Sequence, residues 1–140
     1  MALTDNLIAC YEFESGALTT DATANAHTLT NVNTVTSVSG GKPGNCAAMV
    51  AASSQYFSLA DHADISFGTG SWSIAFWVKM VDVTQSYNLV NKGYYSDNSR
   101  EFNIDYNSNV ANKFSAYISD DGSSGAHVVV QGATTFGATS

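Results

Sequence analysis

The sequence predicts an all-β protein, an antiparallel sandwich of two sheets. Apolar and polar residues alternate over short runs, as they do on strands whose side chains point to opposite faces in turn. These runs recur roughly every ten residues, a spacing typical of sandwiches and barrels. The stretches between them are rich in Gly, Asn, Asp and Ser, which favour turns. No window sustains the apolar 3.6-residue repeat of an amphipathic helix.

The expected strands follow in order along the chain. They are residues 7–13, 45–50, 55–60, 71–80, 101–106, 113–119 and 126–132. The Ala- and Thr-rich segment 15–26 is the nearest approach to a helix, but its Gly and Asn residues favour a loop. The stretch SGGKPG lacks the residue order of a phosphate-binding loop, and it is interpreted as a hairpin turn.

Segment 71–80 has the clearest alternation. Its sequence, SWSIAFWVKM, places Trp72 and Phe76 on one face and Trp77 on the other. A half-exposed strand would carry only small or polar residues on its second face. We therefore expect Trp72 and Phe76 in the core between the sheets, and Trp77 packed under a loop or under further strands. Stacking of Trp77 on a ligand is the alternative.

Composition excludes several classes of partner. The chain has 140 residues and a net charge of −7, with only five Lys and Arg residues. Nucleic-acid binding needs clustered cations that displace counterions, so no nucleic-acid partner is expected. No apolar run approaches the roughly 20 residues of a membrane helix, so no membrane insertion is expected.

The beginning of the sequence lacks the pattern of a signal peptide, because no basic segment precedes an apolar one. A cytoplasmic location, export without a signal peptide, and release by lysis within a virus particle all fit this observation. Cys10 and Cys46 lie among apolar neighbours without metal-ligand spacing, and two buried free thiols are favoured over a disulfide.

The order of the motifs resembles the laminin-G-like, concanavalin-A-like jelly-roll superfamily. The motifs are LIACYEFES, DATANAHTLT, the run from GGKPGNCAAM to GSWSIAFWVK, and LVNKG. The resemblance covers residues 5–132 and is most specific at 68–80. The opening MALTDNLIACYEF is similar to small laminin-G-like proteins of bacteriophages. The resemblance implies a single jelly-roll domain over 1–140, a two-sheet antiparallel sandwich.

One departure from the family pattern concerns the last part of the sequence. Family members continue with strands that complete both sheets, whereas this sequence reaches Ser140 where the next strand is due. We expect that it covers the first two-thirds of a domain, or that a partner chain supplies the remaining strands. Open sheet edges would then lead the chain to associate or aggregate.

An enzymatic function is the weakest hypothesis. Glu101, Asn103 and Asp105 alternate on one strand face, like the carboxylates of laminarinase-type glycosidases. Retaining glycosidases hold two carboxyl groups about 5 to 5.5 Å apart, and this spacing and the central Asn do not fit that pair. A solvated polar face is the favoured interpretation. The three histidines have no repeated spacing, and no catalytic residue is predicted.

A structural calcium site is the only cofactor that the sequence offers. The loop DATANAH contains Asp21 and Asn25, whose oxygen atoms are of the kind that Ca²⁺ prefers. In the resembled family this loop takes part in a cation site. Glycines common there are replaced by Ala22, Ala24 and Ala26, and an Asx-type turn is the alternative.

A ligand site is predicted in the loop that follows LVNK. Aromatic rings beside amide and charged groups suit a sugar, whose apolar face stacks on rings while its hydroxyls need hydrogen-bond partners. A contact with another subunit fits the same residues equally well. The predicted residues are Tyr94, Tyr95, Asp97, Asn98 and Arg100.

Three functions follow in order of preference. The first is a non-catalytic recognition or decoration module on a bacteriophage virion or in the extracellular space, binding a glycan or host-surface polysaccharide. The second is a structural cement protein that joins other virion proteins or copies of itself. The third is a glycoside hydrolase.

Overall fold

The computed structural model describes residues 6–66, 68, 70–93, 99, 101–108, 110–119, 122 and 127–136. Its regular elements are β-strands in antiparallel sheets and two three-residue 3-10 helices, η1 (Ala51–Ser53) and η2 (Ala63–Ile65). The all-β class is therefore confirmed. Within the described residues, no helix has the length and apolar character needed to cross a bilayer. The chain divides into two compact units, Met1–Ser66 and Phe67–Ser140.

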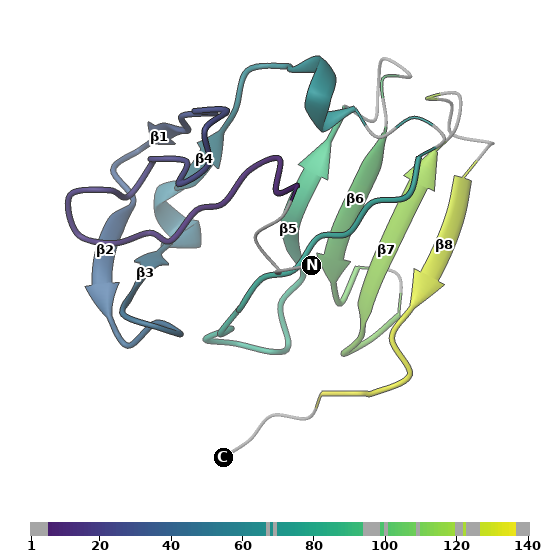
Figure 1. The fold of residues 1–140 in the computed structure, drawn as a ribbon. Coiled ribbons are helices and arrows are strands. Elements are labelled where there is room, and N and C mark those ends of the chain that lie inside the picture. Colours follow the sequence, from purple (N-terminus) through teal and green to yellow (C-terminus); the bar gives the residue numbers. More distant parts are fainter. Residues whose placement is uncertain are drawn as a thin grey trace. The chain divides into compact units, whose positions relative to one another are not determined.

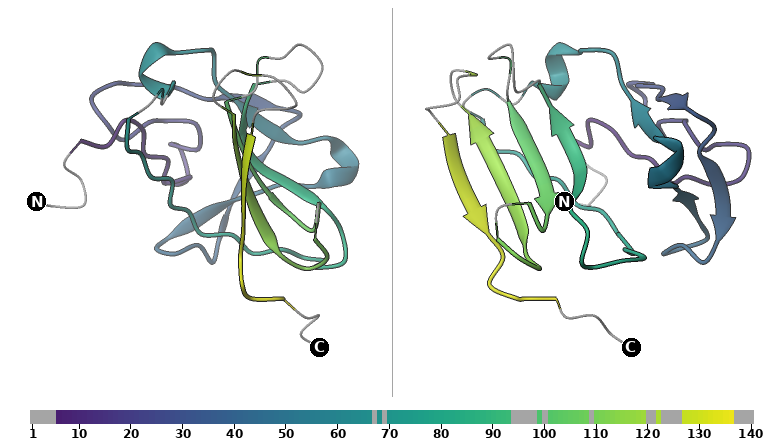
Figure 2. Two further views of the ribbon diagram at one scale, coloured as in Figure 1. Left: turned by 90° about the vertical axis from the view of Figure 1, so that its right-hand side faces the viewer. Right: turned by 180° about the vertical axis from the view of Figure 1, so that it is seen from behind.

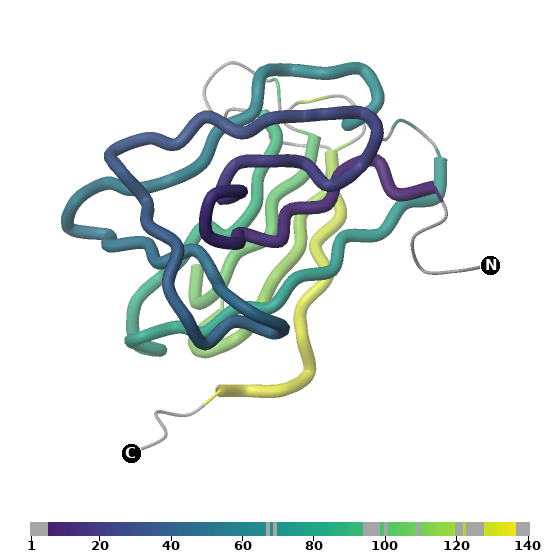
Figure 3. The backbone as a smooth tube through the Cα atoms, turned by 60° about the vertical axis from the view of Figure 1, so that its left-hand side comes forward, coloured from purple at the N-terminus to yellow at the C-terminus, as the bar shows by residue number. Residues whose placement is uncertain are grey.

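The first unit contains two small antiparallel sheets (Figure 1), and Figure 3 traces the backbone that connects their strands. Strand β1 (Thr30–Val32) pairs with β4 (Tyr56–Ser58), and β2 (Thr36–Ser39) pairs with β3 (Asn45–Ala48). The predicted strands at 45–50 and 55–60 are confirmed as β3 and β4. Residues 15–26 form turns, as expected.

The SGGKPG stretch is the predicted hairpin turn, between β2 and β3. The Gly41 N–H donates to the Gly44 carbonyl at 2.9 Å. Gly44 has a φ of +72°, and the Glu14 carboxylate fills the space where a Cβ would lie. The same carboxylate accepts the Asn45 N–H at 3.0 Å, so a side chain at position 44 would displace it and would also strain the left-handed backbone.

Aromatic rings pack inside the first unit. Phe13 stacks on Tyr11 and on Phe57, with ring centroids 6.3 and 5.4 Å away. The predicted strand 7–13 is wrong, because among the described residues its backbone forms only one isolated bridge, between Tyr11 and Asp21. Its aromatic side chains are placed by this packing rather than by a ladder of hydrogen bonds. Cys10 and Cys46 are free thiols and are half-buried.

The second unit contains a four-stranded antiparallel sheet in chain order (Figures 1 and 2). Strands β6, β7 and β8 confirm the strands predicted at 101–106, 113–119 and 126–132, whereas β5 lies in a segment for which no strand was predicted. The strands are β5 (Tyr87–Lys92), β6 (Phe102–Tyr106), β7 (Phe114–Ser119) and β8 (His127–Gln131).

One face of this sheet is apolar and aromatic. Phe102 is 7% exposed, and Tyr106 is fully buried. The Tyr106 ring contacts the Phe114 ring at 5.1 Å, and Phe114 contacts Phe136 at 5.2 Å. Trp72 contacts Phe102 at 5.7 Å, which confirms that Trp72 packs against core residues.

The prediction of a strand at 71–80 is wrong. These residues pair with no strand in the described part of the chain. Alternation indicates an extended segment with two faces, but a strand also needs a neighbour that completes its hydrogen bonds. The predicted burial of Phe76 and Trp77 is also wrong. Phe76 is 43% exposed and Trp77 is 80% exposed, so no described loop covers Trp77.

Candidate functional site

The second face of the four-stranded sheet is polar and carries the candidate site. On β6, Asn103 and Asp105 alternate with the core residues. On β7, Ser115 lies directly opposite Asp105, and Tyr117 lies directly opposite Asn103. Because side chains on directly opposed residues share a face, these four form one group. We call Asn103, Asp105, Ser115 and Tyr117 the polar face.

The polar face is buried yet short of hydrogen-bond partners. Asp105 is 3% exposed and Ser115 is 2% exposed. The Asn103 amide Nδ2 donates to Asp105 Oδ2 at 3.2 Å. Three buried atoms have no hydrogen-bond partner, namely Asn103 Oδ1, Asp105 Oδ1 and Ser115 Oγ. Buried polar atoms are nearly always paired, so three unpaired atoms on one face make it a candidate site for a polar molecule, water included.

A cavity of about 260 Å³ adjoins two residues of the polar face, Asn103 and Asp105. Its lining comes from β6, from the chain just after it and from the chain around the start of β5. The lining residues are Ser86, Tyr87, Asn88, Asn103, Asp105 and Ser108. Polar groups that converge on a cavity are typical of ligand sites.

Burial also shapes the electrostatics of the polar face. It raises the pKa of Asp105, and a hydrogen bond from the Ser108 side chain counteracts part of this rise. Burial raises the pKa of Tyr117 as well, and the charge of Asp105 raises it further.

The three residues considered for the glycosidase hypothesis, Glu101, Asn103 and Asp105, do not form a pair of facing carboxyl groups. Glu101 forms an ion pair with Lys92, with Oε1 and Nζ 2.9 Å apart. Asn103 and Asp105 share a hydrogen bond instead. The interpretation of this face as solvated is wrong at Asp105, which is buried between residues of the two flanking strands, Asn88 of β5 and Ser115 of β7.

The predicted ligand loop lies outside the described residues. This applies to all of Tyr94, Tyr95, Asp97, Asn98 and Arg100. Sequence reasoning did not single out the polar face as a candidate site. The available signal was the polar alternation in EFNIDY opposite the serine and tyrosine of KFSAYIS, read together as one cross-strand surface.

In the first unit, Asp21 organises the loop in which calcium was predicted. Its Oδ1 accepts the N–H groups of Cys10 and Thr23, each at 2.9 Å. Its Oδ2 accepts the His27 N–H at 3.0 Å and the Thr23 hydroxyl at 2.9 Å. Burial acts to raise the pKa of Asp21, but these four hydrogen bonds lower it by more.

These contacts bear on the calcium prediction. Four donors occupy the lone pairs of the Asp21 carboxylate, so a cation there would have to displace some of them. Asn25 donates its Nδ2 to the Ile8 carbonyl at 2.8 Å. Both residues thus have roles in holding the loop, and calcium binding stays a prediction.

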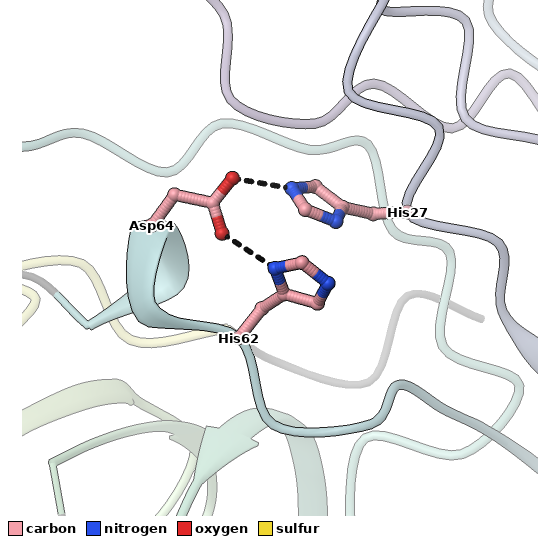
Figure 4. Close-up of side chains that lie close together, drawn as sticks. All are labelled: His27, His62 and Asp64. Atoms are coloured by element: carbon pink, nitrogen blue, oxygen red, sulfur yellow. Dashed lines mark hydrogen bonds and ion pairs between the residues drawn. The ribbon is translucent and has the colours of Figure 1, made fainter.

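A second cluster of side chains in the first unit was not predicted (Figure 4). His27 Nε2 lies 2.8 Å from Asp64 Oδ2, and His62 Nδ1 lies 3.0 Å from Asp64 Oδ1. Partial burial acts to raise the pKa of Asp64, but hydrogen bonds, the first of them from His27, lower it by more. Sequence spacing gave no signal, because the two histidines are far apart in the chain.

Comparison with known proteins gives no relative. No family model, curated protein or solved structure matches this chain.

Proposed function

We propose that the chain is a non-catalytic recognition module that binds a glycan at the polar face. The observation that supports this most strongly is the set of three unpartnered buried atoms on the polar face, two of which belong to residues that line the cavity, Asn103 and Asp105. A ligand rich in hydroxyl groups satisfies such atoms because each hydroxyl both donates and accepts.

The chemistry of the polar face favours a neutral sugar. The Asp105 carboxylate accepts hydrogen bonds, the Asn103 amide oxygen accepts them, and the Ser115 hydroxyl does both. The half-buried Tyr117 adds an aromatic ring for the apolar face of a sugar. A net charge of −7 disfavours anionic polysaccharides.

The proposed setting rests on the family resemblance. The order of the motifs supports a laminin-G-like jelly-roll sandwich, of which the observed antiparallel sheets would be parts. The likeness of the opening residues to phage proteins supports a virion surface, where the module would bind a host polysaccharide. An extracellular location is the alternative.

The test begins with the labelled chain on a glycan array, followed by calorimetric titration of each glycan that binds. Removing a hydrogen bond to a charged group loses about 1.5–3 kcal/mol, so Asp105→Asn should weaken binding roughly tenfold or more. The matched control is Asp82→Asn, a change in an exposed carboxylate of the same unit that forms its own turn with Thr84.

Two results would end the proposal. One is an array on which the folded wild-type chain binds no glycan. The other is a glycan whose affinity Asp105→Asn and Asp82→Asn change equally, since binding would then lie elsewhere.

A structural cement function is the second candidate, and a specific observation favours it. Strand β8 is at the edge of the sheet, and Val128 and Val130 are 64% and 59% exposed. Both share a face with residues of β7, since Val128 is opposite Ile118 and Val130 is opposite Ala116. An exposed apolar edge strand is suited to pairing with another subunit.

A further inference from the structure

The cluster of His27, His62 and Asp64 brings together two segments of the first unit. His27 follows the Asp21 loop, whereas His62 and Asp64 lie at the start of η2. One nitrogen of each ring and one oxygen of the carboxylate lie within 4.8 Å of one another. The two rings meet edge to face, with centroids 4.4 Å apart.

His27 is held firmly in place. Its side chain is 2% exposed. Its N–H donates to Asp21, and its carbonyl accepts the Tyr11 hydroxyl at 2.6 Å. The backbone on both sides of the side chain is therefore fixed, which positions the ring before any ligand arrives.

The other two groups can adjust. The side chains of His62 and Asp64 are 54% and 43% exposed. Zinc binds imidazole nitrogen and carboxylate oxygen at about 2.0–2.2 Å, which in a tetrahedron places neighbouring ligand atoms a little over 3 Å apart. His27 Nε2 and His62 Nδ1 lie 2.8 and 3.0 Å from different oxygens of Asp64, and one ligand atom from each residue lies within 4.8 Å of the other two. Rotation of the exposed His62 and Asp64 side chains would have to bring the three ligand atoms around one metal position.

From this arrangement we propose that His27, His62 and Asp64 form a binding site for zinc or a similar divalent transition metal. Two imidazoles and one carboxylate are a ligand set of this metal class, whereas calcium takes six to eight oxygen ligands. The three groups leave one tetrahedral position to solvent, because two of them are at the surface. A water molecule or a partner's side chain completes the coordination.

The direct test is calorimetric titration of Zn²⁺ into the full chain, with Co²⁺ as the spectroscopic substitute. We expect one saturable site per chain and visible absorption bands typical of four-coordinate Co²⁺. His62→Ala and Asp64→Asn should each weaken Zn²⁺ binding at least tenfold. Both residues are at the surface, so these variants are expected to fold.

Matched controls separate this site from adventitious binding. His127→Ala removes the third histidine of the chain, in β8 of the other unit, and Asp82→Asn removes an exposed carboxylate. Both should bind Zn²⁺ like the wild type. Thermal melts with and without Zn²⁺ give a second measurement, in which only chains with an intact cluster should gain stability.

Two outcomes would overturn the proposal. Absence of saturable Zn²⁺ binding by the folded wild-type chain would mean that the cluster only holds the two segments together through hydrogen bonds. Equal binding by wild type, His62→Ala and Asp64→Asn would place the metal elsewhere.

Discussion

Ser115 and Ser37 both lie in strands, but only the Ser37 hydroxyl forms a hydrogen bond. Ser115 Oγ is buried without a partner, whereas Ser37 Oγ donates to the Phe13 carbonyl at 2.8 Å. An unpaired buried hydroxyl costs about 1–3 kcal/mol, so Ser115→Ala should keep or raise the free energy of unfolding of the free chain. Ser37→Ala should lower it by about 1 kcal/mol.

Chemical denaturation of both variants measures this difference. A clear destabilisation by Ser115→Ala would mean that its hydroxyl is already paired in the free protein. The strongest support for a ligand at the polar face would then be lost.

Ala26 holds a left-handed backbone, with a φ of +54°, at a position where the resembled family often has glycine. Such a conformation is strained for any residue with a Cβ. Ala26→Gly should therefore raise the free energy of unfolding by about 0.5–1 kcal/mol. Ala24→Gly is the matched control: Ala24 is in the same loop without a positive φ, and glycine there should be destabilising. Thermal melts that rank the two variants the other way would contradict this account of the loop.

Asp21 links the stability of its loop to pH. Its pKa in the folded chain is lowered from the ordinary 3.8, so the ionised form is favoured by folding. The resulting stability is complete above the unfolded pKa and is lost as the pH falls through the lower folded pKa. Asp21→Asn should melt at a lower temperature at pH 7, and the difference from wild type should shrink below pH 4.

Glu12→Gln, in an exposed carboxylate of the same unit, is the control and should have little effect. A constant difference between Asp21→Asn and wild type from pH 7 to pH 2.5 would show that the charge of Asp21 contributes nothing.

At the scale of single residues, the sequence could indicate which side chains have the chemistry of a site. It could not indicate which groups they form hydrogen bonds with. Asp21 was singled out because its loop is rich in oxygen ligands. Its hydrogen bonds to Cys10 and His27 depend on how three separate backbone segments meet. The pairing of His27 with Asp64 likewise spans the first unit, and local spacing carries no information about it.

At the scale of elements, strands were predictable where alternation and a neighbouring strand occur together. EFNIDY and KFSAYIS met both conditions, and they form β6 and β7. Segment 71–80 has the alternation, but no described strand pairs with it. Strand β5 was missed because its apolar pattern is interrupted at Asn88 and Asn91, and a register shift between Asn88 and Val90 breaks the period of two.

Strand β8 is predicted to promote self-association. Its outer edge is unpaired among the described residues, and Val128 is exposed beside Ile118. Val128→Lys places a charge on the apolar face of this edge and should reduce the association of the chain. Val81→Lys, at a residue that is 98% exposed and outside the strands, should leave association unchanged.

Light scattering coupled to size-exclusion chromatography, over a range of concentrations, measures this effect. A wild-type chain that stays monomeric at every concentration would contradict the prediction, and with it the cement function.

At the scale of the whole molecule, composition and patterning were sufficient for the all-β class and the antiparallel sheets. They could not give the division into two compact units, because it depends on contacts between residues distant in sequence. They also could not locate the candidate site. The polar face exists only once β6 and β7 pair in the register that sets Asp105 opposite Ser115.

The most direct test of glycan recognition at the polar face is an NMR titration of the isotope-labelled chain with a glycan that it binds. We predict that amide shift changes will concentrate at Asn103, Asp105, Ser115 and Tyr117 and around the cavity at 86–88, and that Asp105→Asn will abolish them at the same glycan concentration. Shift changes confined to residues 92–100, or to the first unit, would contradict the account. Binding would then belong to the loop predicted from the sequence or to another surface.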